Sequence, residues 1–409
     1  MNLFNKKSGV STDEAKIQEL LTRGVENIYP NKEFLGSQLR SGKRLKLYLG
    51  VDPTGPTLHV GHAIPLKKLK EFQELGHEVV LLIGDFTAMI GDPDKLSTRK
   101  QLTRKEVLNN CKLYKKQASV FLKFTGANAA HLEYNSSWLA KMTFEDVIGL
   151  ASKMTVDQML KRDMFKKRME EQRPVYIHEF MYPLMQGYDS VVMNVDGEIG
   201  GNDQTFNMLA GRDLMKEVQN KEKFVITSKL LVDPSGKKMG KTEGNMLTLI
   251  DTADEMFGKV MSWTDAMIID GFELCTNVPA NEISAIKKEL EGGINPRDIK
   301  VRLAKEVIAI YHGAEEAVTA ENNFVNTFKK GGVPEDAPEV SVAAGTKLID
   351  ILLAEKIVAS KGEFRRLVEE GAVSIIDTEE KITSTDVIVT DKGDYRVGKR
   401  RFLKIRIKK

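Results

Sequence analysis

Apolar side chains occupy every second position over residues 45–51, which is the period-two pattern of a β-strand. Pro53 follows and ends that pattern. From Gly61 the apolar residues recur at helical spacing until Gly76, and residues 78–83 (EVVLLI) have the composition of a buried strand. This strand–helix–strand order predicts a parallel sheet that binds ligands at the carboxyl ends of its strands.

The patterns further along the chain extend this sheet. Residues 104–172 are mostly helical in pattern and rich in charge, as expected of an insertion between the two halves of a nucleotide-binding sheet. A helix is then predicted around His178–Tyr188, a strand over Val191–Val195 and a loop over 200–204. A further helix is expected to end before Asn220.

The second half of the chain is predominantly helical in pattern until about residue 330, and one helix there has Asn295 as its N-cap and Pro296 at its first position. Residues 331–345 (GGVPEDAPEVSVAAG) have the composition of a linker. We therefore expect an α/β fold with a Rossmann-like parallel sheet and a helical insertion, followed by an α-helical domain and a small α+β domain. The expected parts are a catalytic domain over 1–232, a lysine-rich loop over 233–245, helices over 246–330, the linker over 331–345 and the small domain over 346–409.

Length and composition fit several domains, because 409 residues with 41% hydrophobic content exceed what one domain usually holds. The N-terminus lacks the apolar region of a signal peptide, and no stretch approaches the ~20 apolar residues of a membrane span. We therefore expect a soluble cytoplasmic protein. Cys111 and Cys275 are too few for a disulfide framework or a four-ligand zinc site, so both are expected to be reduced and buried.

The net charge of +3 is unevenly distributed. Residues 346–409 carry 15 Lys and Arg against 11 Asp and Glu, a net charge of +4, which leaves −1 for the rest of the chain. A solvated surface explains such an excess as well as a polyanionic partner does.

The segment DPTGPTLHVGH, residues 52–62, places His59 and His62 where the strand gives way to a helix. The unpaired N–H groups and the dipole of a helix start attract phosphate, and two imidazoles can donate further hydrogen bonds to it. Gly61 allows a flat nucleotide to approach the backbone. Two histidines at this spacing are usually surface residues, but the preceding strand and the Pro-Thr-Gly turn favour a phosphate site.

A second loop, GKKMGKT over residues 236–242, has one residue too few between its glycines for a Walker-type phosphate loop and follows a turn, not a strand. Taken alone, such a loop is usually a solvated turn. Lys238 and Lys241 are nevertheless spaced as a mobile clamp for a departing pyrophosphate would require.

Together, His59-Val60-Gly61-His62 and Lys238-Met239-Gly240-Lys241-Thr242 resemble the HIGH and KMSKS signatures of the class I aminoacyl-tRNA synthetases. Gly240 and Thr242 depart from the commonest serines, but such variants are familiar among tyrosine enzymes. The resemblance runs from about Leu35 to the C-terminus. It implies catalytic roles for five residues, His59, His62, Lys238, Lys241 and Thr242. It also implies ATP contacts for three more, Asp52, Gly61 and Met239.

The segment YPLMQGYD spaces Tyr182, Gln186 and Asp189 four and three apart, which stacks them on one face of a helix. Pro183 predicts a kink or an irregular turn within it. Three polar residues on a solvent-exposed face would give the same spacing. The segment also resembles the amino-acid pocket of tyrosyl-tRNA synthetases, which implies that Tyr182 and Gln186 lie near the α-amino group and that Asp189 accepts from the substrate phenol.

Other segments resemble the same family. Tyr48 matches a position whose hydroxyl contacts the phenol in some members, although it is also an ordinary strand aromatic. Asp92 resembles the carboxylate that faces the α-ammonium group, and Thr87 is a weaker candidate for the tyrosine site. As a plain turn residue, Asp92 would need no functional explanation.

The loop Gly201-Asn202-Asp203-Gln204 resembles the GxDQ loop of the family. The resemblance implies that Gly201 and Asp203 contact the ribose of ATP and that Gln204 faces the carbonyl group of tyrosine. Asp203 could equally cap the next helix, and the two roles are compatible.

The C-terminal segment resembles the small RNA-binding domain shared with a ribosomal small-subunit protein and pseudouridine synthases. Ser360–Glu363 is a capping-box sequence before a helix that ends at Gly371, and a second basic group closes the chain. The residues expected to contact RNA phosphates are Lys361, Arg365, Arg366, Arg400 and Arg401.

The resemblance implies a ligase of protein biosynthesis that activates L-tyrosine with ATP and transfers it to tRNA(Tyr). Mg²⁺ would arrive with ATP, no protein metal site is expected, and a homodimer would form through the insertion. A tryptophan enzyme is an alternative, which Asp189 and the C-terminal domain disfavour. A non-catalytic RNA-binding regulator is another, which the intact His59, His62, Lys238 and Lys241 disfavour.

Overall fold

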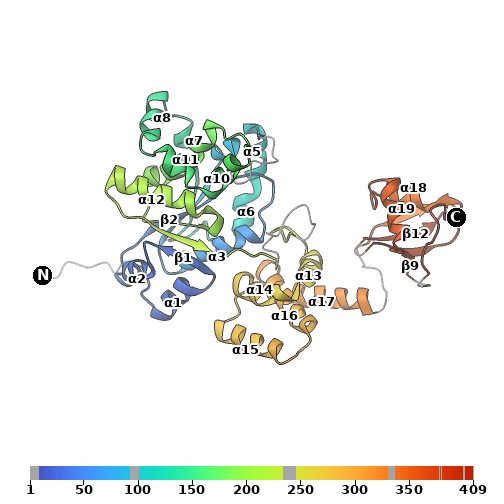
Figure 1. The fold of residues 1–409 in the computed structure, drawn as a ribbon. Helices are drawn as coiled ribbons and strands as arrows, with labels where there is room; N and C mark the ends of the chain where they lie inside the picture. Colours follow the sequence, from blue (N-terminus) through green and yellow to red (C-terminus); the bar gives the residue numbers. More distant parts are fainter. Residues whose placement is uncertain are drawn as a thin grey trace. The chain divides into compact units, whose positions relative to one another are not determined.

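The structure, a computed structural model, describes residues 9–92, 101–233, 246–329, 337–376, 378, 380–398 and 401–408. The chain divides into two compact units, which Figure 1 shows as ribbons coloured along the sequence. The first comprises Met1–Thr252 with Lys259–Tyr311, and the second comprises Ala253–Gly258 with His312–Lys409. Among the described residues, no helix is both long enough and apolar enough to span a bilayer.

The first unit is built on a six-stranded sheet with helices around it (Figure 1). Five neighbouring strands are parallel, and β1 pairs antiparallel with β6 at one edge. This confirms the predicted Rossmann-like fold class. The strand order is β1 (Val25–Tyr29), β6 (Phe224–Ser228), β5 (Gly197–Gly201), β2 (Lys46–Val51), β3 (Glu78–Ile83) and β4 (His131–Tyr134).

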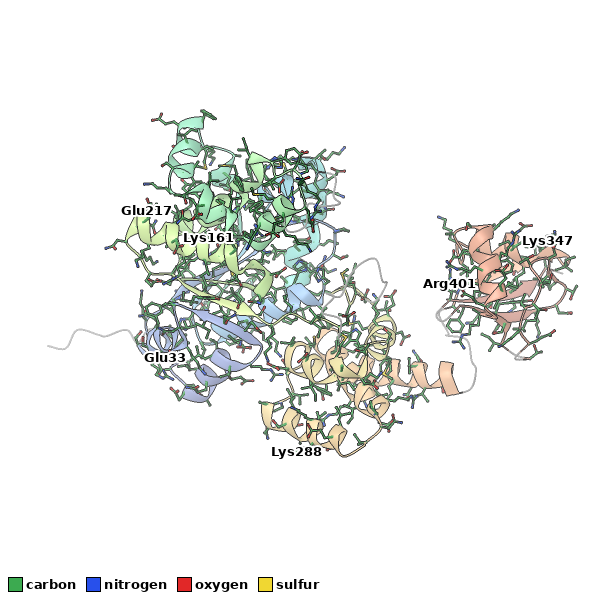
Figure 2. All side chains as sticks on the ribbon, viewed as in Figure 1. Glu33, Lys161, Glu217, Lys288, Lys347 and Arg401 are labelled. Carbon is green, nitrogen blue, oxygen red and sulfur yellow. The ribbon has the colours of Figure 1, made fainter. Side chains whose placement is uncertain are left out.

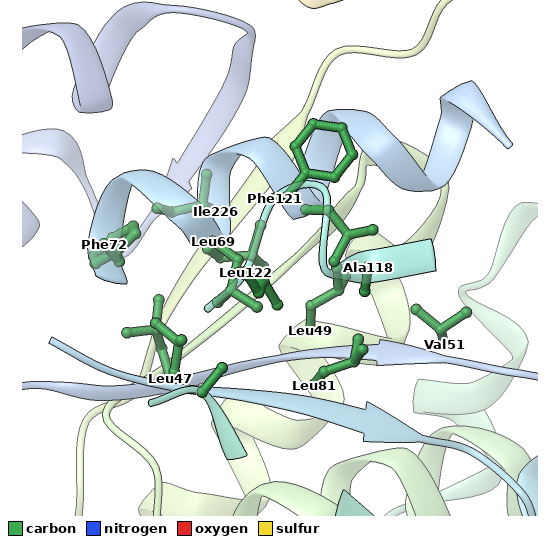
Figure 3. Packing of buried hydrophobic residues seen from close by; sticks show 14 of the residues in the cluster. Leu47, Leu49, Val51, Leu69, Phe72, Leu81, Ala118, Phe121, Leu122 and Ile226 are labelled. Atoms are coloured by element: carbon green, nitrogen blue, oxygen red, sulfur yellow. The ribbon is translucent and has the colours of Figure 1, made fainter. Parts of the chain in front are cut away.

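Both faces of β2 are buried. Leu47, Leu49 and Val51 belong to the main core, which also contains Leu69 and Phe72 of helix α3 (Val60–Glu74), as Figure 3 shows. The side chains between them point to the other face, where Tyr48 packs in a separate cluster. The alternation in the sequence therefore marks two buried faces, as is typical of a parallel sheet covered on both sides.

The predicted strand over Val191–Val195 is wrong. Helix α11 extends over Ile177–Met193 and remains helical on both sides of Pro183, without an irregular turn. The strand lies later in the chain, as β5. A Cβ atom at its first residue would lie 2.1 Å from the ring of Phe224, so glycine is needed there. Glycines conceal a strand from sequence patterns because β-branched and aromatic residues are the usual signal.

The segment predicted to be a helical insertion contains short helices, several of which begin at threonine capping boxes. It also contains β4, a sheet strand that the sequence pattern did not predict. The helices are α5 (Arg104–Asn110), α6 (Tyr114–Ala118), α7 (Ser136–Leu139), α8 (Phe144–Ala151), α9 (Val156–Leu160) and α10 (Asp163–Glu170).

The helices between residues 205 and 329 agree with the predicted helical patterns, whereas three helices over residues 14–22, 32–40 and 87–90 lie in segments for which no helix was predicted. The Asn295 side chain accepts from the Arg297 N–H at 3.1 Å, which confirms the predicted N-cap, and Asn220 ends α12 as expected. Cys111 and Cys275 are buried free thiols, also as expected. These helices are α1 (Glu14–Thr22), α2 (Lys32–Arg40), α4 (Thr87–Ile90), α12 (Thr205–Gln219), α13 (Ala253–Met261), α14 (Ile268–Cys275), α15 (Ala280–Glu291), α16 (Pro296–Tyr311) and α17 (Ala314–Lys329).

The C-terminal part of the second unit has its own apolar core between two helices and a four-stranded sheet. Its first strand, β7 (Glu339–Val342), lies within the segment that we expected to be linker and pairs in parallel with β12. Ser360 caps α19, as predicted. The other elements are α18 (Leu348–Ala354), α19 (Lys361–Glu369), β8 (Thr346–Lys347), β9 (Val373–Ile375), β10 (Ile388–Val389), β11 (Gly393–Val397) and β12 (Arg401–Ile407).

Candidate active site

A cavity of about 560 Å³ opens at the carboxyl ends of strands β2, β3 and β5, where a parallel sheet of this kind binds its ligands. Each site residue predicted for the first unit lies on its wall, apart from those in the second signature loop. Lys238, Met239, Lys241 and Thr242 of that loop lie outside the described residues. The predicted residues in the wall are Tyr48, Asp52, His59, Gly61, His62, Thr87, Asp92, Tyr182, Gln186, Asp189, Gly201, Asp203 and Gln204.

The two histidines cap helix α3 and contact one another. Nδ1 of His59 accepts from the Gly61 N–H at 3.1 Å, and Nδ1 of His62 accepts from the His59 N–H at 3.2 Å. Their ring centroids lie 4.0 Å apart. Because Nδ1 accepts in both rings, the neutral rings carry their proton on Nε2 and can donate from that atom.

A chain of hydrogen bonds joins the residues at the floor of the cavity. Asp52 accepts from Tyr182 at 2.8 Å and from Thr87 at 2.7 Å. Asn135 donates to Thr87 at 3.0 Å and to Asp189 at 3.2 Å. The chain therefore links Asp52, which follows β2, to Asp189 of α11 through Thr87 of α4 and Asn135, which follows β4. Asn135 has no recognisable local motif, because its partners lie about 50 residues away in the sequence.

Asp189 is 2% exposed and accepts from the indole N–H of Trp138 at 2.7 Å. Burial raises the pKa of this carboxyl group, while the hydrogen bonds from Trp138 and Asn135 oppose that rise. A buried acceptor held by two donors has a fixed direction, as a site that binds one phenol hydroxyl needs. Sequence patterns also failed to identify Trp138 as part of this arrangement.

Asp92 divides its two oxygens between different partners. Oδ1 accepts from Arg162 at 3.0 Å and Oδ2 accepts from Gln204 at 2.8 Å. Arg162 is 5% exposed and lies near the rings of Phe165 and Phe206. It precedes α10, so a residue of the predicted insertion holds a carboxylate of the cavity wall.

Tyr48 and Gln186 line the cavity and also contact a cluster of buried polar residues. The Tyr48 hydroxyl lies 2.9 Å from Ser190 Oγ, and Gln186 donates to Glu198 at 2.9 Å. Glu198 also accepts from Lys223. Burial raises the pKa of Tyr48, with contributions from Glu198 and Asp189. The hydroxyl therefore stays protonated at neutral pH.

Two glycines keep the wall open beside acidic side chains. A Cβ atom at Gly84 would lie 2.0 Å from Asp52 Oδ1, and one at Gly201 would lie 2.6 Å from Asp203 Oδ1. Both distances are shorter than any real contact of that kind. Sequence patterns identified Gly201 but missed Gly84.

In the second unit, Lys361, Arg365 and Arg366 are exposed on helix α19. Arg401, which is labelled in Figure 2, donates to Glu363 at 2.8 Å and to the Ile357 carbonyl at 2.6 Å. Its guanidinium group thus ties β12 to the segment around the start of α19. Arg400 lies outside the described residues.

Comparisons with known proteins point to one family. The model for tRNA synthetases class I (W and Y) matches residues 40–329. The tyrosine–tRNA ligase of Carboxydothermus hydrogenoformans is 46% identical, over 96% of this chain and 98% of that protein. The Haemophilus ducreyi tyrosine–tRNA ligase is 43% identical, over 97% and 99%.

Solved structures agree. A C-terminally truncated mitochondrial tyrosyl-tRNA synthetase of Coccidioides posadasii aligns with a TM-score of 0.62 and 27% identity, over 75% of this chain and 91% of that one. The tyrosyl-tRNA synthetase of Archaeoglobus fulgidus shares the fold at a TM-score of 0.59 and 20% identity, over 75% and 99%. The chain therefore belongs to the tyrosyl-tRNA synthetases of the class I family.

Proposed function

We propose that the cavity of the first unit binds tyrosine and ATP side by side and joins them as tyrosyl-adenylate. The chain is a tyrosine–tRNA ligase by family, so the activated tyrosine then passes to the 3′ end of tRNA(Tyr). The observation that carries this proposal is one cavity wall that contains both the paired histidines and Asp189. The reaction needs both a site for the phosphates of ATP and an acceptor for the phenol of tyrosine.

For ATP, we assign His59 and His62 to the phosphates, with Gly61 giving access to the helix start. Their Nε2 donors suit anionic oxygens, and the N-terminus of α3 adds its dipole. Gly201 and Asp203 are assigned to the ribose. Further ATP contacts are assigned to Asp52 and Met239, and pyrophosphate contacts to Lys238, Lys241 and Thr242.

For tyrosine, Asp189 is assigned to the phenol, and Asp92, Tyr182 and Gln186 to the α-ammonium group. Two carboxylates near that end, Asp52 and Asp92, favour a cation there. Smaller contributions are assigned to Tyr48, Thr87 and Gln204.

No protein side chain becomes covalently attached to the substrate in this mechanism. The tyrosine carboxylate attacks the α-phosphorus in line, pyrophosphate leaves, and the protein contributes positioning and charge stabilisation. Mg²⁺ enters as part of the Mg·ATP substrate. We place the chain in the cytoplasm, where its tRNA substrate is used.

We assign the two chemical steps to different parts of the chain. Residues 1–232, with the insertion 104–172 and the loop 233–245, make the adenylate. The helices of 246–330 and the small domain of 346–409 bind tRNA, with Lys361, Arg365, Arg366, Arg400 and Arg401 near its phosphates. The exposed side chains of α19 support this assignment.

We further propose a homodimer that forms through the insertion. Phe144 on α8 is 80% exposed, Val156 on α9 is 63% exposed and Ile177 at the start of α11 is 82% exposed. The three helices share one small apolar core, so they are neighbours in the structure. Exposed apolar side chains at this density favour a protein partner. A monomeric mass in light scattering, unchanged by Phe144→Glu, would contradict the proposal.

The exchange of radiolabelled pyrophosphate into ATP, measured with each of the twenty amino acids, tests the activity directly. Rapid exchange with tyrosine alone is the expected result. Strong exchange with tryptophan, or none with any amino acid, would refute the assignment.

A further inference from the structure

A lysine ammonium group lies buried behind the cavity. Lys223 precedes strand β6 and has no exposed surface. Its Nζ donates to Glu198 Oε2 at 2.5 Å and to Ser190 Oγ at 2.9 Å. Space for the ammonium group depends on a glycine, because a Cβ atom at Gly211 would lie 2.8 Å from Nζ. A buried charge in so tight a site is costly, and it persists only when paired.

Glu198 connects this ammonium group to the cavity. It is 1% exposed, and its second oxygen, Oε1, accepts from the amide nitrogen of Gln186 at 2.9 Å. Both partners are donors, since an ammonium group has no acceptor and the Gln186 nitrogen carries two hydrogens. Glu198 therefore serves as an ionised acceptor on both sides, and Lys223 supplies the compensating charge.

The contact with Glu198 fixes the orientation of the Gln186 amide. With the nitrogen turned to Glu198, the amide oxygen is the polar atom that this side chain can offer to the cavity that it lines. An amide oxygen attracts an ammonium group, whereas an amide NH₂ group in the same place would repel it. The contact with Glu198 thus decides which atom of Gln186 a ligand in the cavity meets.

We propose that Lys223 is a positioning residue for tyrosine binding, which acts through Glu198 to hold the Gln186 amide oxygen toward the α-ammonium group of the substrate. The inference rests on the proposed function and extends it to Lys223, which does not line the cavity. Burial lowers the pKa of Lys223 and the ion pair with Glu198 opposes that change, so the pairing supports the charged state that the role needs.

The donors and acceptors of Lys223, Glu198 and Gln186 allow a specific test of this role. In Glu198→Gln, the new amide must present its oxygen to Lys223, because an ammonium group cannot accept. Its NH₂ group then faces Gln186, whose amide must turn over and direct its own NH₂ group into the cavity. In the double variant Glu198→Gln with Lys223→Met, residue 198 is free to turn its oxygen back to Gln186, so the original orientation returns.

Two ligands separate this effect from general damage. L-Tyrosinol carries both a phenol and an ammonium group, and 3-(4-hydroxyphenyl)propan-1-ol carries the phenol alone. Dissociation constants by calorimetry should show that Glu198→Gln weakens tyrosinol about 10- to 100-fold, as the loss of an acceptor for a charged group predicts. The ligand without nitrogen should change less than about twofold, and the double variant should recover most of the tyrosinol affinity.

A purely structural ion pair predicts a different result. Equal weakening of both ligands in Glu198→Gln, or a double variant that binds tyrosinol no better than the single variant, would overturn the inference. The two variants are nearly isosteric with the native residues, and their folding is checked by thermal unfolding. Failure of the unaltered protein to bind tyrosinol would overturn the proposed function and this inference together, so the two failures are distinguishable.

Discussion

The hydroxyl group of Tyr182 donates a 2.8 Å hydrogen bond to Asp52 and thereby joins helix α11 to the end of strand β2. Burial raises the pKa of Tyr182, and the carboxylates of Asp52 and Asp92 add to that rise. The hydroxyl therefore remains a donor at physiological pH. Tyr182 and Asp52, which the resemblance assigned to different substrates, thus form one unit at the floor of the cavity.

Tyr182→Phe should weaken tyrosine binding more than ATP binding. The change removes the hydroxyl group that we assign to the α-ammonium end of tyrosine and that donates to the nearby carboxylate of Asp52. We therefore expect the KM for tyrosine to rise about tenfold, as the loss of a charged hydrogen bond predicts. Tyr188→Phe on the same helix is the matched control, because Tyr188 does not line the cavity. Pyrophosphate exchange at varied tyrosine and varied ATP gives both constants. A similar rise in both would mean that the hydroxyl stabilises the whole cavity.

Asp189→Ala should damage the use of tyrosine far more than the use of phenylalanine. A buried acceptor that phenylalanine cannot satisfy normally rejects that substrate, and tyrosine enzymes are themselves the standard example of this discrimination, so we infer only its direction for this chain. Trp138→Phe is an informative companion, because it removes one of the two donors that orient the carboxylate. The ratio of kcat/KM for the two amino acids is the measurement. An unchanged ratio would leave Asp189 with a structural role.

Lys238→Ala and Lys241→Ala should each slow adenylate formation about a hundredfold, with little change in tyrosine affinity. The charge that they neutralise develops as pyrophosphate departs, so their effect belongs to the transition state. Single-turnover kinetics separates binding from chemistry. Variants that lose tyrosine binding but activate bound tyrosine at the normal rate would disprove the clamp.

Local patterns predicted several of the elements, because each of these depends on neighbours within about one helical turn or one strand. Short motifs identified the site residues through their resemblance to the family. β2, α3 and β3 are examples, and so is the Asn295 cap. Residues whose partners are distant in sequence were missed. Arg162 meets Asp92 from 70 positions away, and Lys223 meets Glu198 from 25. The strand β5 was missed for another reason: packing against Phe224 demands glycine, which is a weak strand former.

His77 should make stability depend on pH. Burial lowers its pKa from 6.5 to about 4, and nearby Arg44 adds to that effect. Between these values the unfolded chain binds a proton that the folded chain does not, so the contribution of His77 to stability is complete above pH 6.5 and is lost as the pH falls toward 4.

In the native chain, the Leu45 N–H donates to His77 Nδ1 at 3.2 Å. The variant His77→Gln keeps an acceptor for this N–H group. In this variant, the free energy of unfolding should depend less on pH between 4 and 6.5, by up to about 1.4 kcal/mol per pH unit. Urea unfolding at several pH values, compared with the unaltered protein, gives the difference. Parallel pH profiles for the variant and the unaltered protein would show that His77 titrates alike in the folded and unfolded states.

The position of strand β7 decides where the chain can be cut. Residues 339–342 lie within the segment that resembles a linker by composition, yet they pair in parallel with Lys404–Ile407 of β12. A chain ending at Gly345 would retain this strand without its partner, and an unpaired strand is a site of aggregation. A chain ending at Lys329 would remove the strand together with its sheet.

We expect the chain ending at Lys329 to make tyrosyl-adenylate and to fail in tRNA charging. Every described residue of the cavity wall lies before residue 232, and the second signature loop is also retained, so pyrophosphate exchange should stay within about threefold of the full chain. The removed part includes the small domain of residues 346–409, which carries a net charge of +4, so the loss of tRNA affinity should be greatest at low salt, where phosphate contacts contribute most. The chain ending at Gly345 is the control, with the same catalytic residues and more aggregation. Loss of exchange in a folded chain ending at Lys329, or undiminished tRNA charging by it, would refute this division of labour.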